Sequence, residues 1–423
     1  MTNIDNLFQF IKQSPTAYHT VESVKSRLFS LGYTELFEED EWRLSDGGKY
    51  FVIRNGSSIV AFRTVSDANG FMICAAHADT PSFSVKVSAE NKGAYTTLDV
   101  EKYGGSIMYS WLDRPLSVAG RVAVKTKEGI ATRIFNIDKD FATIPSLAIH
   151  LNREVNNGYK FNPAKDMLPL ISSASAEKDF LDLLAASASI NKEDIISFDA
   201  CLYNRDEGKI IGASDEYILC PRLDNLECSF AALEAFVSAK STRSVPVLAI
   251  FDNEEVGSAT MNGANSTLLS DILQRIAANS YSRMLANSLM VSADNAHAKH
   301  PNYPELSDKN NAPIMNGGVV IKWNANRRYT TDCISDAIFK EIMKRCGAKY
   351  QSFCSRADMP CGSTLGGISS TRVSVNCIDI GLAQLAMHSA NETAGAQDLD
   401  TMISALREFF STSLVRRGEN FEF

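Results

Sequence analysis

The chain has 423 residues, of which 45% are hydrophobic and 22% are charged, and its formal net charge is −8. A chain of this length is too long for one ordinary domain and is comfortable as two. The acidic balance gives no reason to expect a nucleic acid or an anionic membrane surface as a partner.

The first part of the chain predicts a helix followed by a buried strand. Apolar residues recur at helical spacing over 16–31, and His19 in this segment is expected to pack or to cap the helix. The continuous apolar run 71–76 predicts a strand that leads into His77 and Asp79. Side chains two residues apart on extended chain point the same way, so this carboxylate can fix the tautomer of a metal-binding imidazole.

The next part, residues 91–220, predicts a mostly β region. Segments such as 121–125 favour strands, and one stretch, 177–188, favours a helix. His150 stands between two apolar residues, which predicts a half-buried histidine on a strand. The region contains almost none of the candidate metal ligands, so we expect it to be an insert.

Acidic residues mark two boundaries in the following part. Asp224 precedes the helical segment 226–237, where taken alone it would be a helix N-cap. The apolar run 245–251 ends shortly before Glu254 and Glu255. A solvated strand end would explain an isolated Glu-Glu pair, but buried carboxylates need a strong partner such as a metal pair. In a strand-end turn the two side chains diverge, so Glu255 can bind a cation while Glu254 acts as a general base toward water.

The C-terminal part repeats this pattern. The apolar run 289–293 ends at Asp294, and His388 follows a short apolar segment. Lys322 ends a third apolar run, where it forms a structural ion pair or reads a carboxylate of a substrate. The glycine-rich segment 362–367 would by itself be a structural turn. Three further segments have helical periodicity: 266–278, 333–346 and 399–410.

Together these segments predict an α/β protein. Four apolar segments end in, or run directly into, a His, Asp or Glu, and in open α/β sheets such ends converge on the functional crevice. We therefore expect a discontinuous catalytic domain, residues 1–90 and 221–423, with a mixed sheet flanked by helices. Residues 91–220 would form a β-rich domain inserted into it.

The order of these motifs resembles the aspartyl aminopeptidases, a family of two-metal exopeptidases that includes vacuolar aminopeptidase I. The resemblance runs nearly end to end, and small departures at Ala78 and Arg327 spare every position expected to touch metal. The segments that carry it are 14–19, 77–81, 148–153, 222–225, 252–257, 294–302, 322–326 and 358–364.

The resemblance implies two divalent metal ions that share Asp224. His77 and Asp294 would complete one site, Glu255 and His388 the other. Glu254 would be the general base, and Asp79 would support His77. Mixed carboxylate and imidazole ligands suit zinc, manganese or cobalt, and we take zinc as the default.

The resemblance also implies an aminopeptidase that removes acidic N-terminal residues, Asp or Glu, from peptides. The insert would be a dimerisation domain, and the subunits would build a dodecamer. Within the insert, His150 would reach the active site of a neighbouring subunit. Of the two histidines that follow Asp294, His300 is favoured over His297 because His-Pro-Asn fixes a turn. The expected substrate-binding residues are His150, His300, Lys322, Met359, Gly362 and Ser363.

The remaining features suit a cytoplasmic enzyme. No apolar run reaches the roughly 18 residues of a membrane span, and Asp5 stands where a signal peptide would need cationic and then apolar residues. The nine scattered cysteines predict reduced thiols. Two alternatives stay open: a carboxypeptidase or amidohydrolase with the same metal ligands, and an inactive oligomeric scaffold.

Overall fold

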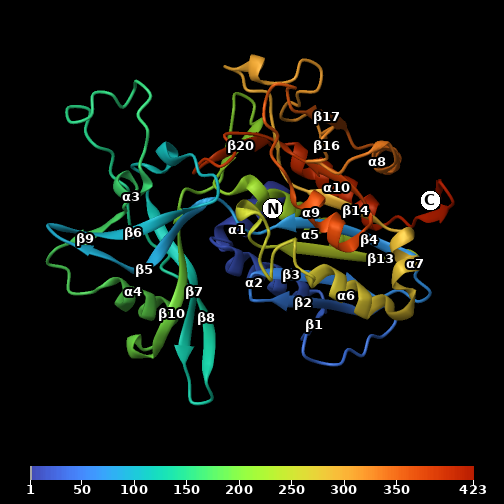
Figure 1. Cartoon of the computed structure of the whole chain (residues 1–423), viewed down its shortest axis with the longest axis horizontal. Helices are drawn as coiled ribbons and strands as arrows, with labels where there is room; N and C mark the ends of the chain where they lie inside the picture. Colours follow the sequence, from blue (N-terminus) through green and yellow to red (C-terminus); the bar gives the residue numbers. More distant parts are fainter. Residues whose placement is uncertain (1) are drawn as a thin grey trace.

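The structure, a computed structural model, describes residues 2–423 and has two parts that lie side by side (Figure 1). The larger part contains a nine-stranded mixed sheet flanked by helices, and the smaller part contains a six-stranded antiparallel sheet. This architecture confirms the predicted fold class.

The nine-stranded sheet places four parallel strands, β13, β4, β14 and β18, at its centre. Antiparallel neighbours flank this group on both sides. In spatial order the strands are β1 (Thr34–Leu36), β2 (Lys49–Arg54), β3 (Ser58–Arg63), β13 (Ser244–Phe251), β4 (Gly70–His77), β14 (Leu289–Ala293), β18 (Asn376–Gly381), β16 (Val319–Trp323) and β17 (Tyr350–Cys354).

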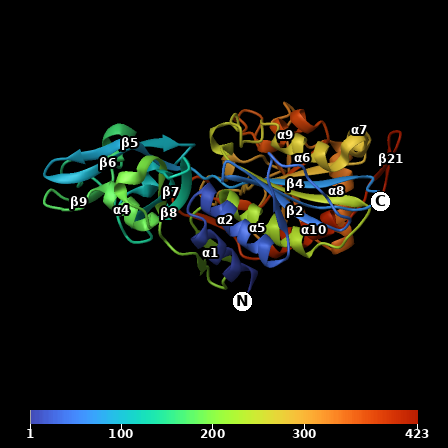
Figure 2. The same cartoon turned by 90° about the horizontal axis from the view of Figure 1, so that it is seen from below.

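Helices cover both faces of this sheet, and Figure 2 shows the two layers. Strand β4 is apolar on both faces and must be covered on both. Its Met72 and Cys74 face one apolar core, and its Ile73 and Ala75 face the other. One core is closed by α1 (Asn3–Gln13), α2 (Ala17–Ser30), α5 (Leu223–Ser238), α8 (Cys333–Cys346) and α10 (Asp398–Phe410). The other is closed by α6 (Leu268–Ala277), α7 (Tyr281–Ala286) and α9 (Leu365–Val373).

The predicted helices are confirmed, with ends within about three residues of those expected from helical periodicity. Helix α8 shows why its boundaries were readable. Its first backbone N–H groups donate to the side chain of Asp332, and the chain leaves the helix at Gly347 with φ +67°. The pattern did not predict α1, α9 or the short helices α3 (Pro163–Asp166) and α7. Helix α9 has a Gly-Gly pair in its first turn.

The smaller sheet has its own apolar core, closed on one side by α4 (Phe180–Ala188). The short helix α3 (Pro163–Asp166) lies nearby in the same part. The strands, all antiparallel to their neighbours, follow the order β8 (Ile130–Asn136), β7 (Leu116–Lys125), β10 (Ile195–Asn204), β5 (Ser82–Lys92), β6 (Tyr95–Tyr103) and β9 (Leu170–Ser173).

These strands come from residues 82–204, so the sheet begins before residue 91 and ends before residue 220. Strand β12, which ends at Cys220, pairs with β20 of the larger part instead. A third sheet has the order β11 (Lys209–Ile211), β12 (Tyr217–Cys220), β20 (Glu392–Gly395), β19 (Ala383–Leu385) and β15 (Ala296–His297). The C-terminal hairpin is β21 (Val415–Arg417) and β22 (Asn420–Glu422).

Candidate metal centre

Three neighbouring strands end together at one edge of the nine-stranded sheet. Because β13, β4 and β14 are parallel, their carboxyl ends lie at the same edge. His77 is the last residue of β4, Asp294 follows β14, and Glu254 and Glu255 follow β13 in a 3₁₀ turn. Asp224, in the first turn of α5, lies at the same edge.

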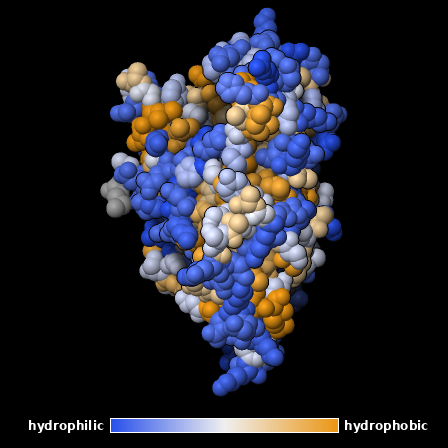
Figure 3. Space-filling view, turned by 90° about the vertical axis from the view of Figure 1, so that its left-hand side faces the viewer, coloured by the Kyte–Doolittle hydropathy of each residue, from blue (hydrophilic) through white to orange (hydrophobic). Residues whose placement is uncertain are grey.

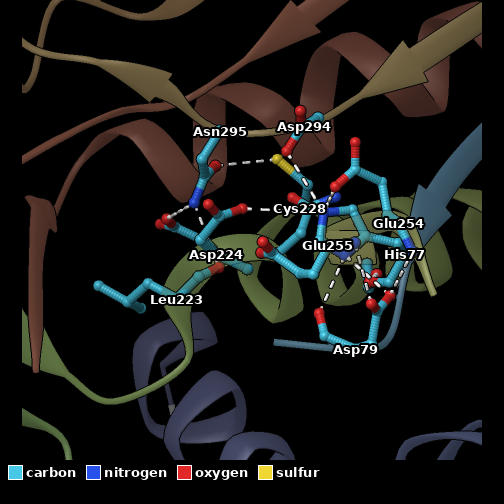
Figure 4. A network of polar contacts seen from close by, with 12 residues as sticks. His77, Asp79, Leu223, Asp224, Cys228, Glu254, Glu255, Asp294 and Asn295 are labelled. Atoms are coloured by element: carbon cyan, nitrogen blue, oxygen red, sulfur yellow. Dashed lines mark hydrogen bonds and ion pairs between the residues drawn. The ribbon is translucent and has the colours of Figure 1, made fainter. Parts of the chain in front are cut away.

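One group of candidate ligands consists of His77, Asp224 and Asp294, all of which are buried. The Nε2 atom of His77 lies 3.5 Å from Oδ1 of Asp294 and 3.9 Å from Oδ1 of Asp224. Figure 4 shows these side chains converging from β4, α5 and the end of β14. The structure thus brings together the three residues predicted for one ion.

A second group consists of Asp224, Glu255 and His388. The Nε2 atom of His388, in the loop between β19 and β20, lies 3.4 Å from Oδ2 of Asp224 and 3.4 Å from Oε1 of Glu255. Asp224 belongs to both groups, with a different oxygen facing each histidine. This is the position expected of a shared carboxylate.

These residues fit a pair of divalent ions. Two ligands of one tetrahedral zinc, each at about 2.0–2.1 Å from the ion, stand roughly 3.3 Å apart, close to most of the separations above. The buried Oδ1 of Asp224 has no hydrogen-bond partner among residues 2–423. A buried acceptor without a donor is costly, and a bound cation would satisfy it.

The charges of the site point the same way. Burial raises the pKa of Glu255 well above its usual value, and the neighbouring Asp224 raises it further. Burial alone would lower the pKa of His77, but hydrogen bonds to Asp294 and Asp79 outweigh it and raise the pKa. Carboxylates held this close repel one another, so the cluster needs positive charge to stay ionised.

Glu254 lies beside the first group without completing it. Its Oε2 atom is 4.0 Å from Nε2 of His77, and it also forms a third possible cation group with His77 and Glu255. Burial raises the pKa of Glu254 to about 7. A carboxylate with a pKa near the working pH suits proton transfer.

Asp79 supports the site from behind. The backbone carbonyl of Asp79 lies 2.9 Å from Nδ1 of His77, and its carboxylate Oδ1 lies 3.4 Å from the same nitrogen. The carboxylate also accepts hydrogen bonds from the backbone N–H groups of Glu254 and Glu255, each at 3.1 Å. One aspartate therefore orients the imidazole and the following turn together.

A pocket of about 180 Å³ opens on the metal centre. Three of the predicted substrate-binding residues line this pocket: Lys322, Gly362 and Ser363. The Nζ atom of buried Lys322 donates to the backbone oxygen of Asn295 at 2.7 Å and lies 3.4 Å from Oδ2 of Asp294. Its ammonium thus has an ion-pair partner and also faces the pocket.

The other predicted substrate-binding residues do not line this pocket. The sequence favoured His300 as a pocket residue, but His297 lines the pocket instead. His297 lies on β15 beside the pocket, whereas His300 lies in the following turn against Tyr303. Met359 lies outside as well and is 42% exposed.

His150 was expected to be half-buried on a strand, and this expectation is wrong. His150 is exposed in a turn of the segment 145–153, which precedes α3 and projects from the smaller sheet (Figure 1). The apolar neighbours Ile149 and Leu151 are exposed as well, at 47% and 75%. The alternation that predicted a strand is therefore not matched by burial.

The remaining predicted histidine, His19, packs as expected. It is buried in α2, and its Nδ1 lies 2.8 Å from Oγ1 of Thr16, the N-cap residue of that helix. Burial lowers the pKa of His19 to about 4.

Sequence reasoning missed two residues that organise the centre. Buried Glu392 on β20 accepts hydrogen bonds from the backbone N–H groups of Asp224 at 2.8 Å and His388 at 2.6 Å. Tyr103, the last residue of β6, donates to Asp79. The only available signals were an acid four residues after His388 and an aromatic residue before Gly104, and both are too common to interpret alone.

Comparison with known proteins places this chain among the metallopeptidases. Residues 10–410 match the family described as aminopeptidase I zinc metalloprotease, M18. The chain is 42% identical over 422 residues to a probable M18 family aminopeptidase 2 of Clostridium acetobutylicum, covering 96% of this chain and 98% of the relative. The chain belongs to the M18 family of metalloaminopeptidases, which confirms the resemblance read from the sequence.

Solved structures agree with this assignment. A chain in the cryo-EM structure of the Ape4 and Nbr1 complex superposes with a TM-score of 0.93 at 35% identity, covering 97% of this chain and 85% of that one. A chain of the S. cerevisiae mApe1 dodecamer superposes with a TM-score of 0.85 at 27% identity, covering 96% of each chain. Over residues 2–423, no helix combines the length and apolar character needed to cross a membrane.

Proposed function

We propose that this protein removes acidic residues, Asp or Glu, from the N-termini of peptides through a pair of divalent ions, most simply zinc. The observation that supports it best is the pair of ligand groups that share Asp224, with Glu254 beside them. Two divalent ions bound there would polarise the scissile carbonyl, lower the pKa of an attacking water and accept a free α-amino group.

The residues of the chain supply the remaining chemistry. Glu254 takes the proton of the attacking water and returns it to the leaving amine, a role that suits a pKa of about 7. Asp79 keeps Nδ1 of His77 engaged so that Nε2 faces the site. Binding of the free α-amino group by one of the ions would favour an exopeptidase over an endopeptidase.

The acidic preference is supported by Lys322. Its Nζ lies at the pocket wall and has one 3.4 Å ion pair and one backbone hydrogen bond. A third N–H remains to meet the carboxylate of a substrate side chain. Lys322→Met should raise KM for aspartyl peptides much more than for leucyl peptides. An equal change for both substrates would make Lys322 a structural partner of Asp294.

The activity itself is tested with chromogenic substrates. Aspartyl, leucyl and N-acylated amino acid substrates should be compared before and after removal of metal by a chelator and after its restoration. We expect aspartyl hydrolysis that disappears and returns with metal. Hydrolysis of the acylated substrates would indicate a carboxypeptidase or amidohydrolase. Metal binding without hydrolysis of any of the three would indicate a scaffold.

The similarity to known proteins also supports a proposal about the assembly of subunits. The similar mApe1 of S. cerevisiae is described as a dodecamer, and we propose that this chain also self-associates, with the smaller sheet as a dimerisation domain. Figure 3 views that end of the molecule and shows hydrophobic groups scattered among hydrophilic ones. Exposed apolar side chains of segment 145–153, including Ile149 and Leu151, would be covered by a second subunit. A cytoplasmic location remains our proposal.

A further inference from the structure

The smaller sheet reaches the metal centre through the end of β6. The hydroxyl of Tyr103 donates to Oδ2 of Asp79 at 2.6 Å and accepts from Nδ2 of Asn253 at 3.0 Å. Strand β6 belongs to the six-stranded sheet, whereas Asp79 and Asn253 follow strands of the nine-stranded one. This contact is therefore a short hydrogen bond to a buried carboxylate between the two parts, and such bonds are among the stronger ones.

Asp79 transmits this contact to the site. Its Oδ1 lies 3.4 Å from Nδ1 of His77 and 3.1 Å from the backbone nitrogen of Glu254, and its Oδ2 lies 3.1 Å from that of Glu255. Rotation of this carboxylate would disturb an imidazole ligand, the proposed base and a carboxylate ligand together. The Tyr103 hydroxyl opposes that rotation.

The residues after Tyr103 touch the second ligand group. A side-chain carbon added at Gly104, where φ is +68°, would lie 3.1 Å from Cβ of Glu255. One added at Gly105 would lie 3.1 Å from Nδ1 of His388. The backbone N–H of Ile107 donates to the carbonyl of His388 at 2.9 Å. Because Gly104 and Gly105 lack side chains, the backbone passes this close to both ligands without crowding them.

We propose that residues 103–107, which we call the β6 exit segment, are a positioning element of the metal centre. Tyr103 fixes the site of His77 through Asp79, and Gly105 with Ile107 fixes His388. The smaller sheet then does more than associate subunits, because it sets the geometry in which the ions are bound. The inference rests on the proposed two-ion function.

The test compares Tyr103→Phe with Tyr95→Phe. Both residues lie on β6, and Tyr95 is 66% exposed, so the control removes the same atom far from the site. Zinc affinity is measured on metal-free protein by competition with a chromogenic chelator. We expect Tyr103→Phe to weaken at least one of the two zinc-binding steps about 10–100-fold, because Asp79 contacts both His77 and the backbone of Glu255. Tyr95→Phe should bind zinc as the unmodified protein does. Unchanged zinc affinity in Tyr103→Phe would overturn the proposal.

A double variant shows whether Tyr103 acts through Asp79. If it does, Tyr103→Phe should have little further effect on zinc affinity when Asp79 is already Asn. The same fold-loss in both backgrounds would overturn this route. Gly105→Ala should weaken binding of the ion held by His388, and unchanged zinc affinity in this variant would contradict the role given to Gly105.

These measurements separate the inference from the proposed function. If the unmodified protein binds two zinc ions but hydrolyses none of the three substrate classes, the proposed function fails while the affinity comparison still tests the β6 exit segment. If hydrolysis is seen and Tyr103→Phe binds zinc normally, the inference fails alone.

Discussion

The two parts of this protein differ in whether they bury charged side chains. Among the described residues, the larger part buries acids that include Asp79, Asp224 and Glu392, and it buries Lys322 as well. In residues 82–204 the buried polar side chains are Ser, Thr and Asn, and no acidic or basic residue is buried. The comparison locates the chemistry, because a carboxylate remains charged in an apolar setting only when a strong partner compensates it.

Topology explains the difference. The parallel strands of the larger sheet deliver their carboxyl-end residues to one edge, so residues distant in sequence meet there. In the antiparallel sheet successive strand ends alternate between edges, so no comparable cluster forms. The smaller part instead contributes single features, the β6 exit segment and the exposed segment that carries His150.

The largest expected effect tests the shared acid of the larger sheet. Asp224→Ala should remove both ions and all activity, because the two cations would lose their common ligand and repel each other. Asp294→Ala and His388→Ala should each deplete mainly one ion. Metal content per subunit is the measurement, with the exposed Glu193→Ala as control. Equal metal content in the three site variants would contradict the shared role.

The next effect separates the base from the ligands. Glu254→Gln should keep both ions and the fold but lose about 10²–10⁴-fold in turnover, the usual contribution of a general base. Metal content and kcat are measured on the same preparation. Loss of an ion would instead make Glu254 a ligand, as its group with His77 and Glu255 also allows.

The third effect tests whether the smaller part serves a neighbouring site. We expect His150→Ala to lose activity equivalent to about 2.7–4 kcal/mol, the usual contribution of one hydrogen bond to a developing oxyanion. Mixing Glu254→Gln with His150→Ala subunits should restore part of the turnover, because some sites then combine both intact residues. Glu254→Gln mixed with itself is the control. Mixed dimers as inactive as either parent would confine His150 to its own chain.

The smallest effect concerns a histidine remote from the ions. The pKa of His19 is lowered to about 4 in the folded protein, against about 6.5 when unfolded. The unfolded chain binds the proton first as pH falls, so His19 lowers the free energy of unfolding between about pH 6.5 and pH 4. At pH 5 this loss is about 2 kcal/mol.

His19→Gln should remove this dependence. The Tm of the unmodified protein should therefore fall relative to that of the variant between pH 7 and pH 5. Taking the difference cancels the common effect of acid on the metal ligands. A difference in Tm that stays constant with pH would mean that folding does not lower the pKa of His19.

Much of the candidate metal centre could be predicted from the sequence alone. His77, Asp294 and Glu255 each follow an apolar run, and in an open α/β sheet the ends of such strands converge on the functional crevice. Helical periodicity predicted the helix 333–346 to the residue, and the structure shows Asp332 and Gly347 capping its two ends. The order of the motifs carried the family assignment.

The sequence by itself thus determined the strands that lead into the candidate ligands and most of the helices, because periodicity acts over a few residues. Only the tertiary structure decided which side chains meet. It placed His297 at the pocket instead of His300, exposed His150, and joined Tyr103 to Asp79 and Glu392 to Asp224. Such pairings depend on sheet register and on how the two parts pack, and both are set by contacts between residues far apart in the chain.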